Sequence, residues 1–209
     1  MTETIVLASS NSGKVREINQ LLDGTGICVI PQSDFNVTDV EETGLTFVEN
    51  AILKARNAAR HTGLPAVADD SGIEVDALHG APGIFSARFA GVGASDRANL
   101  EKLLADLHSV PDARRTARFQ CLMVYMRHAE DPTPMIFQGT WEGRILLEPR
   151  GENGFGYDPV FFVPAENCSS AELAADVKNR LSHRGQALRQ LVQALRVHRL
   201  PDDVEEVGC

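Results

Sequence analysis

The sequence predicts an α/β fold in which helices pack on a mixed β-sheet. Segments typical of strands and of helices alternate along most of the chain, and the chain opens with a strand, a turn of small residues and a helix. Several later strand-like segments follow one another through short connections, which indicates hairpins and antiparallel pairing. Interleaved helices together with hairpins therefore favour a sheet that holds both parallel and antiparallel neighbours.

The first strand is the apolar run of residues 5–8, and residues 9–13 form the turn that follows it. A helix is predicted from there to about Leu22, because Val15, Ile18 and Leu22 recur at the spacing of one helical face.

A second helix is predicted to begin near Thr46. Thr46 and Glu49 have the spacing of a capping box, in which each side chain satisfies a free amide at the start of a helix. Phe47 and several alanines give this helix an apolar face, and Lys54 lies on its polar face.

Residues 65–68 are predicted to form a strand, and Asp69, Asp70, Ser71 and Gly72 are predicted to form a turn. Residues 73–77 alternate between apolar and polar, which indicates a further, half-buried strand.

The remaining elements follow from the same patterns. Helices are predicted at residues 95–107, 170–178 and 182–197, and strands at 117–127, 135–141, 144–147 and 160–163, with Glu142 and Gly143 as a hairpin turn. Residues 1–200 are predicted to form one domain, and the acidic residues 201–209 a disordered tail.

Composition narrows the classes of partner. A formal charge of −9 argues against a nucleic acid or an anionic membrane as the main partner. The N-terminus lacks the pattern of a signal peptide, and the four cysteines are too scattered for a zinc site or a disulfide framework. We therefore expect a cytoplasmic protein that binds neither nucleic acid nor membrane.

A phosphate site is one interpretation of the first turn. Ser9, Ser10, Asn11, Ser12, Gly13 and Lys14 lie between a strand and a helix, where free backbone amides and a lysine favour anions. The segment is not a Walker A loop, because Ala8 and Val15 replace the first glycine and the metal-binding hydroxyl residue. An ordinary capped polar turn is the alternative.

Acidic pairs precede and follow the second helix. Glu41 and Glu42 lie before it, and Asp69 and Asp70 follow the next strand. Carboxylate oxygens at strand ends are what Mg²⁺ requires, although solvated turns and helix-dipole pairs are common alternatives for such residues.

Two further segments carry polar and aromatic side chains that suit a nucleotide. Phe155, Gly156, Tyr157 and Asp158 follow Gly154 in a glycine-rich loop, where backbone can approach a ligand and a flat ring can face a base. The second segment comprises Lys178, His183 and Arg184, which lie near a junction of two helices. Helix ends attract basic residues in any case, so each segment alone is weak evidence.

Together and in this order, these segments closely resemble the Ham1-type inosine triphosphate pyrophosphatase family, in its bacterial XTP/dITP branch. The segments that carry the resemblance are ASSNSGKVREI, EETGLTFVENAILKAR, AVADDSGIEVDALHGAPGIFSARFAG, NGFGYDPVFFVP and LSHRGQAL. The resemblance implies a long mixed sheet, with two α/β lobes flanking a central cleft, and a homodimer. It also implies Mg²⁺-dependent hydrolysis of ITP, dITP and XTP to a monophosphate and pyrophosphate.

The resemblance also implies residue roles. Residues 9–14 would bind the triphosphate, Glu41 and Asp70 would hold Mg²⁺, and Asp70 would be the general base, with Lys54 assisting the leaving group. The residues that would line the nucleotide pocket are Ser71, Phe155, Gly156, Tyr157, Asp158, Lys178, His183 and Arg184. Ser10 stands where the family commonly has glycine, and a positive φ there would strain serine.

For base selection, we predict that Arg184 or a nearby amide donates to O6 of a 6-oxopurine and that Asp158 accepts from N1–H. Two alternatives remain: a Maf-type pyrophosphatase acting on pyrimidine or modified nucleotides, and a non-catalytic nucleotide-binding protein.

Overall fold

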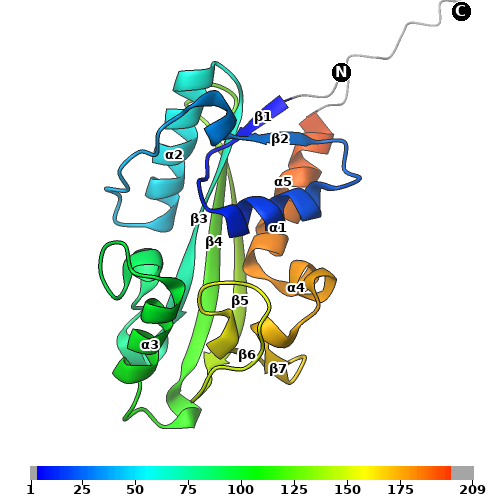
Figure 1. The fold of residues 1–209 in the computed structure, drawn as a ribbon. Helices are drawn as coiled ribbons and strands as arrows, with labels where there is room; N and C mark the ends of the chain where they lie inside the picture. The colour runs from blue at the N-terminus through cyan, green and yellow to red at the C-terminus, as the bar shows by residue number, and fades with distance from the viewer. Residues whose placement is uncertain (1–3, 199–209) are drawn as a thin grey trace, which may run out of the picture.

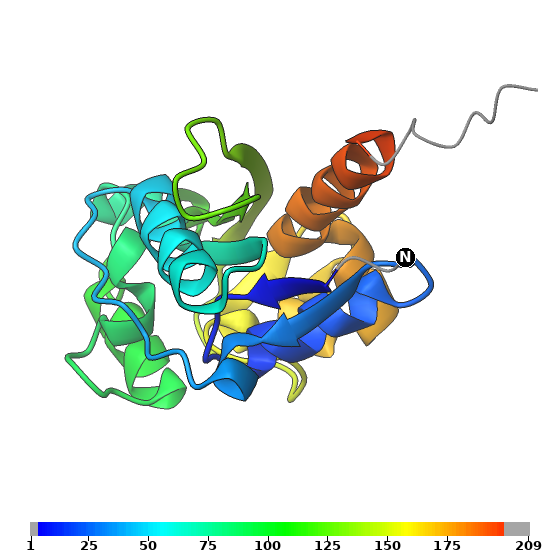
Figure 2. The ribbon, with the colours of Figure 1, turned by 90° about the horizontal axis from the view of Figure 1, so that it is seen from above.

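A seven-stranded mixed sheet forms the centre of the protein, and helices cover both of its faces (Figures 1 and 2). The computed structural model describes residues 4–198. The strand order is β2-β1-β3-β4-β5-β6-β7, in which β1 pairs in parallel with β2 and β3 and all later neighbours are antiparallel. The strands are β1 (Thr4–Leu7), β2 (Cys28–Pro31), β3 (Ala66–Val75), β4 (Thr116–Met126), β5 (Met135–Ile145), β6 (Phe161–Val163) and β7 (Cys168–Ser169). The predicted mixed α/β fold is therefore confirmed, although the sequence patterns missed the short strands β2 and β7.

The long strands β3, β4 and β5 run the length of the molecule in Figure 1. The predicted turn at Asp69–Gly72 is wrong, because β3 continues through these residues. Its neighbour β4 holds it in unbroken register, with Asp70 opposite Leu122 and Gly72 opposite Gln120. Pairing along a long neighbouring strand supplies the backbone hydrogen bonds that a local turn would otherwise provide, so it overrides the turn preference of Asp-Asp-Ser-Gly.

The predicted hairpin turn at Glu142 and Gly143 is also wrong. β5 runs straight through both residues, with Gly143 opposite Ala117 in β4. A Cβ atom at Gly143 would lie 2.5 Å from the Phe161 ring. This glycine therefore allows close packing within the sheet and does not mark a reversal of the chain.

Five α-helices lie on the sheet within the described residues. They are α1 (Ser12–Leu22), α2 (Phe47–Thr62), α3 (Asp96–Asp106), α4 (Ala175–Leu181) and α5 (His183–His198). The capping box of α2 is confirmed, because Thr46 accepts from the amide of Glu49 while the Glu49 carboxylate accepts from that of Thr46. The helix predicted at residues 170–178 begins only at Ala175, because Ser170–Glu172 forms a separate 3-10 turn.

Three apolar clusters divide the core. One lies between the sheet and helices α1 and α5, a second lies under α2, and a third joins α3 to the far end of β3, β4 and β5. Figure 2 shows α2 on one side of the sheet and α1 and α5 on the other. In the part of the chain that the structure describes, no helix is long and apolar enough to cross a membrane. The predicted acidic tail at 201–209 lies outside the described residues.

Candidate functional site

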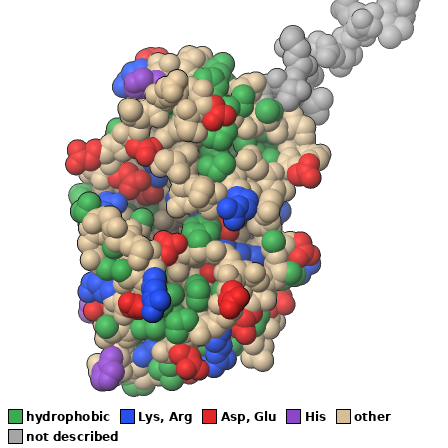
Figure 3. Space-filling model, viewed as in Figure 1, with side chains coloured by type: hydrophobic (Ala, Val, Ile, Leu, Met, Phe, Trp, Pro, Cys, Tyr) green, Lys and Arg blue, Asp and Glu red, His purple; other side chains and the backbone are tan. Residues whose placement is uncertain are grey.

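A cleft of about 420 Å³ lies beside the middle of the long strand β3. The loop after β1, the polar face of α2, the middle of β3, the loop before β6 and the α4–α5 junction all contribute to its walls. Figure 3 shows the molecule in the view of Figure 1, with acidic and basic side chains interspersed across its face. The structure brings the following predicted site residues to the cleft: Ser9, Ser10, Asn11, Lys14, Lys54, Asp70, Ser71, Phe155, Gly156, Tyr157, Asp158, Lys178, His183 and Arg184.

The predicted phosphate loop is a capped helix start. Asn11 is the N-cap of α1, and its side-chain oxygen accepts from the amide of Lys14 at 3.0 Å. Ser12 and Gly13 form the first turn of α1 and are not among the residues that line the cleft. Among the described residues, the non-glycine positions with positive φ are Asn36, His79 and Asn167. Ser10 is therefore not strained, and the loop accommodates serine there.

Asp69 and Asp70 are neighbours on β3, so their side chains point to opposite faces of the sheet. Asp70 faces α2 and lines the cleft, whereas Asp69 is fully buried toward α1 and α5. The strand geometry thus gives two identical side chains different surroundings.

Asp69 joins the two ends of the site. Its carboxylate lies 2.7 Å from Lys14 Nζ and accepts from Arg184 Nε at 3.1 Å and from the thiol of Cys121 at 3.3 Å. Burial alone would raise the pKa of Asp69, but the charges of Arg184 and Lys14 hold it well below its ordinary value. Asp69 is therefore a buried anion that fixes one cation of the phosphate loop and one of the α5 junction. The sequence patterns gave Asp69 no role beyond its place beside Asp70 in an acidic pair suited to Mg²⁺.

Lys54 bridges two carboxylates in the cleft. Its Nζ atom donates to Asp70 Oδ1 at 2.8 Å and to Glu42 Oε1 at 3.1 Å. Burial raises the pKa of Asp70, and the nearby Lys54 only partly opposes this effect. Burial lowers the pKa of Lys54, but Asp70 and Glu42 outweigh it and the net shift is upward, so Lys54 stays protonated.

Glu42 occupies the place that the sequence analysis expected for Glu41. The Glu41 side chain is exposed and is not among those that line the cleft, whereas Glu42 faces Lys54 and Asp70. Within residues 4–198, no group of three or more acidic, histidine or cysteine side chains is arranged to hold a metal ion. Glu42 and Asp70 nevertheless offer two hard carboxylates around one positive charge, a donor set that suits Mg²⁺ completed by water and phosphate.

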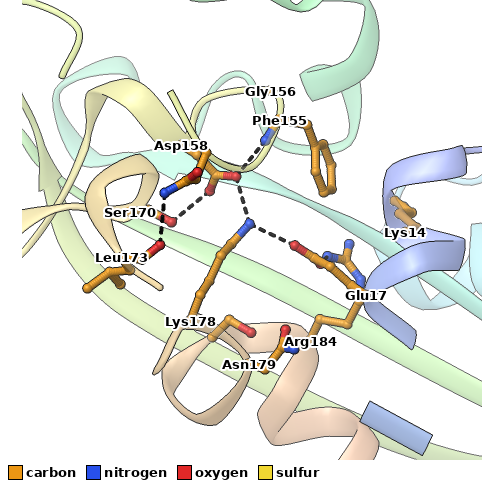
Figure 4. Close-up of polar contacts among 12 residues, drawn as sticks. Lys14, Glu17, Phe155, Gly156, Asp158, Ser170, Leu173, Lys178, Asn179 and Arg184 are labelled. Atoms are coloured by element: carbon orange, nitrogen blue, oxygen red, sulfur yellow. Dashed lines mark hydrogen bonds and ion pairs between the residues drawn. The ribbon is translucent and has the colours of Figure 1, made fainter. Parts of the chain in front are cut away.

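At the other end of the cleft, Asp158 organises the glycine-rich loop (Figure 4). Its Oδ2 accepts from the amide of Phe155 at 2.8 Å and from Lys178 Nζ at 2.7 Å, and its Oδ1 accepts from Ser170 Oγ at 2.8 Å. Gly154 is required here, because its φ is +78° and a Cβ would lie 2.1 Å from Asp158 Oδ2. Both carboxylate oxygens already have protein donors, so the arrangement does not favour the predicted contact of Asp158 with a base.

Glu17 is a residue of the site that the sequence analysis missed. It lies on α1, three residues after Lys14, and its carboxylate accepts from Lys178 Nζ at 2.7 Å and from Arg184 Nη1 (Figure 4). Arg184 also donates from Nη2 to Ser71 Oγ at 2.9 Å. All three guanidinium nitrogens of Arg184 therefore have protein acceptors, which leaves two of its five N–H groups for other contacts. The signal in the sequence was the helical spacing of Glu17 and Lys14, which places them on the same side of α1.

Phe155 lines the cleft beside Lys178 and Arg184. Lys178 Nζ is 5.1 Å and Arg184 Cζ is 5.8 Å from the centre of its ring. The ring edge also approaches Gly13, where a Cβ would lie 2.9 Å from it. The aromatic ring is thus held by cation–π contacts at a point where it can face a planar ligand.

His183 is a buried imidazole at the start of α5. Its ring stacks on Phe119, with centroids 4.7 Å apart and an interplanar angle of 11°, and its Nδ1 has no hydrogen-bond partner among the described residues. Burial, followed by the charges of Arg184 and Lys178, holds the pKa of His183 well below its ordinary value. His183 is therefore neutral and offers one polar atom without a partner at the cleft.

This buried imidazole predicts a pH dependence of stability. The pKa of His183 is depressed in the folded state, so the unfolded chain binds more protons below the ordinary histidine pKa of about 6.5. The contribution of neutral His183 to the free energy of unfolding is complete above about pH 6.5 and is lost as the pH falls below it. The loss is about 1 kcal/mol between pH 7.5 and pH 5.5. A His183→Phe variant keeps a stacking ring, so its stability, measured by urea unfolding, should fall less over this range. The exposed His128 replaced by Asn is the control, and an equal loss in all three proteins would contradict the assignment.

Comparisons with known proteins show what the whole chain is similar to. A model of the Ham1 family matches residues 5–194 of the chain. A dITP/XTP pyrophosphatase from Vibrio parahaemolyticus is 64% identical over 191 residues, which cover 91% of this chain and 96% of that protein. One from Thioalkalivibrio sulfidiphilus is 63% identical, with coverage of 91% and 97%. The solved structure of a HAM1 protein from Coxiella burnetii is 52% identical in sequence and has a TM-score of 0.87. The match covers 94% of this chain and 100% of that one.

Proposed function

The chain belongs to the Ham1 family, and on this premise we propose that it is a pyrophosphatase of non-canonical purine nucleotides. It would hydrolyse ITP, dITP and XTP to the nucleoside monophosphate and pyrophosphate. The observation that carries this proposal is the cleft in which Lys54 bridges Glu42 and Asp70, with the capped start of α1 at one end and Phe155, Lys178 and Arg184 at the other. Relatives that share more than 60% of their residues with this chain are named dITP/XTP pyrophosphatases, which supports the same reaction.

The triphosphate would bind at the start of α1. The backbone amides of Ser12 and Gly13 lie in its first turn, and the residues of the loop from Ser9 to Asn11 line the cleft beside them. Free amides and the positive end of the helix dipole favour phosphate oxygens at such a position. Lys14 would contribute its charge while it remains paired with Asp69.

We propose Mg²⁺ as the cofactor, held by Glu42 and Asp70 in place of the expected Glu41 and Asp70. When bound, a divalent cation neutralises charge on phosphate oxygens during the transfer. Lys54 already places a positive charge between the same two carboxylates. It would keep contact with at least one of them while it stabilises the departing pyrophosphate.

Asp70 is the proposed general base for the attacking water. Its Oδ1 is bonded by Lys54 at 2.8 Å, whereas its Oδ2 has only the longer contact with Asn50 Nδ2 at 3.4 Å. We therefore propose that Oδ2 is the oxygen that accepts the proton of the attacking water. Asn50 is fully buried, and its Oδ1 also accepts from the amide of Gly44. It therefore fixes the loop that carries Glu42 relative to the Asp70 carboxylate.

The base end of the cleft is rich in hydrogen-bond donors. Asp158 and Glu17 have protein donors on both of their oxygens, while Arg184 retains N–H groups without a protein acceptor. Such a site can donate hydrogen bonds to the oxygen at C6 of hypoxanthine and to the oxygens at C2 and C6 of xanthine. It disfavours the amino groups of adenine and guanine, because the carboxylates of Asp158 and Glu17 are already engaged by protein donors. Phe155, Gly156 and Tyr157 would form the wall against which the base stacks, and Ser71 and His183 would complete the pocket.

The test is release of pyrophosphate from ITP, XTP, GTP, ATP, CTP and UTP, each with Mg²⁺ and with EDTA. We expect metal-dependent release from ITP and XTP, at rates at least about a hundredfold above those for GTP and ATP. Orthophosphate as the product would contradict the proposed reaction. Preference for a pyrimidine nucleotide would favour the Maf-type alternative, and absence of release from all of them would favour a non-catalytic nucleotide-binding protein.

We further propose that the protein acts as a homodimer in the cytoplasm, where it meets free purine nucleotides and needs no nucleic acid or membrane partner. Light scattering of the purified chain would measure the oligomeric state directly.

A further inference from the structure

We infer that Arg88 is a positioning residue for Glu42 and sets how tightly the cleft binds a divalent cation. The inference rests on the proposed function, in which Glu42 and Asp70 hold the cation. It adds a residue to which the sequence motifs gave no role and which is not among those that line the cleft.

Two cations hold the Glu42 carboxylate, one on each oxygen. Lys54 Nζ donates to Oε1 at 3.1 Å, and Arg88 Nη1 donates to Oε2 at 3.2 Å. Glu42 itself lies in a segment between residues 36 and 46 that forms neither helix nor strand. The side-chain contacts of Glu42 are therefore decisive for the position of its carboxylate.

Arg88, in contrast, lies on a firmly held part of the chain. It ends the 3-10 helix Gly83–Arg88, which packs on β3 through Ser86. Ser86 Oγ accepts from the amide of Ile73 at 2.9 Å and donates to the carbonyl of Gly83 at 2.6 Å. Tyr157 OH donates to the Ser86 carbonyl at 2.8 Å, so the segment is anchored from two directions.

The Arg88 guanidinium is also fixed within its own helix. Its Cζ lies 5.2 Å from the centre of the Phe85 ring, a cation–π contact that orients the group toward Glu42. Phe85 is 53% exposed, and this contact gives a reason for a large aromatic side chain at the surface.

A cation that binds between Glu42 and Asp70 must share the place that Lys54 now occupies, because Lys54 contacts both carboxylates. Arg88 then remains on Oε2 of Glu42 and leaves Oε1 directed at the cation. The charge of Arg88 opposes the cation, but the Arg88 and Glu42 side chains are 32% and 28% exposed, so solvent screens that repulsion. Positioning therefore outweighs repulsion.

The experiment measures cation binding in two ways. We expect Arg88→Ala to raise the Mg²⁺ concentration for half-maximal ITP hydrolysis about tenfold, as is typical for loss of a residue that orients a metal ligand. The Kd for Mn²⁺, measured by EPR of the free ion without nucleotide, should rise by a similar factor, while kcat at saturating Mg²⁺ stays within about threefold of the wild type. Arg88→Lys should recover part of the affinity, and Arg60→Ala, which removes an exposed charge from α2, should leave both constants unchanged.

A double-mutant cycle separates positioning from direct contact with substrate. In a Glu42→Gln background, loss of Arg88 should change the Mn²⁺ Kd by less than about twofold, because Arg88 acts through the Glu42 carboxylate. An equal effect of Arg88→Ala in both backgrounds, or a change confined to the KM for ITP, would overturn the inference. If the wild type released no pyrophosphate from ITP and bound no Mn²⁺, the proposed function would fail and this inference with it. A wild type that does both, with an Arg88→Ala variant unchanged in cation binding, would overturn the inference alone.

Discussion

Replacement of Asp70 by asparagine is expected to lower kcat for ITP hydrolysis about a thousandfold, with a change in KM of less than about threefold. The amide keeps the size of the side chain and a hydrogen-bond acceptor for Lys54, but it cannot take a proton from water at Oδ2. It also removes a negative charge from the proposed cation site. The measurement is initial-rate kinetics of pyrophosphate release over a range of ITP concentrations, repeated at several Mg²⁺ concentrations.

The Mg²⁺ series distinguishes the two roles of Asp70. If excess Mg²⁺ restored most of the activity, the residue would hold the cation without acting as the base. Asp106→Asn, at an exposed position on α3, makes the same chemical change away from the cleft and should leave kcat intact. Near-normal turnover of Asp70→Asn at all Mg²⁺ concentrations would contradict both roles.

Replacement of Asp69 by asparagine is expected to lower the free energy of unfolding by about 3–5 kcal/mol and also to reduce activity strongly. The loss removes the carboxylate that pairs with both the partly buried Lys14 and the buried Arg184, which keeps only its ion pair with Glu17. Breaking a buried ion pair by removing one partner is costly. For a chain of this size, the melting temperature should fall by roughly 10 °C. Because the pKa of Asp69 is held below its ordinary value, its contribution is present above about pH 4 and is lost as the pH falls below it. The stability difference between wild type and variant should therefore narrow in acid.

Asp131→Asn is the matched control for this prediction. The Asp131 side chain is 1% exposed and pairs with Arg127, but it is not among the residues that line the cleft. It should lose stability without losing kcat for ITP, whereas Asp69→Asn should lose both. An Asp69→Asn protein as stable as the wild type would contradict the view that Asp69 joins the two ends of the site.

The local elements that carry the site follow from local sequence. The capping box of Thr46 and Glu49 fixed the start of α2, and the apolar spacing of Val15, Ile18 and Leu22 predicted α1. These signals are local because helix starts are determined by hydrogen bonds within a few residues. The two turns predicted at Asp69–Gly72 and Glu142–Gly143 were wrong because these residues pair with the neighbouring strand β4. The hydrogen bonds to β4 come from residues far away in the sequence, so a local pattern does not reveal them.

Local sequence patterns also could not show which of two neighbouring acidic residues faces the cleft. Glu41 and Glu42 are adjacent and identical, yet only Glu42 faces Lys54, and Asp69 and Asp70 differ only in the face of β3 to which they point. A shift of one residue in an irregular segment or on a strand reverses the direction of the side chain, and tertiary packing decides it.

Sequence patterns were enough to predict the α/β class, several of the elements that form the walls of the cleft and 14 of the 27 residues that line it. Which polar atoms of these residues are already hydrogen-bonded to protein partners follows from tertiary packing, which no sequence pattern revealed. Asp158 and Arg184 were expected to read the base, but Ser170, Lys178, Glu17 and Asp69 engage most of their atoms. Those partners are separated along the chain by between 12 and 167 residues, so the chemistry that remains free for a substrate is set by which distant groups fold together.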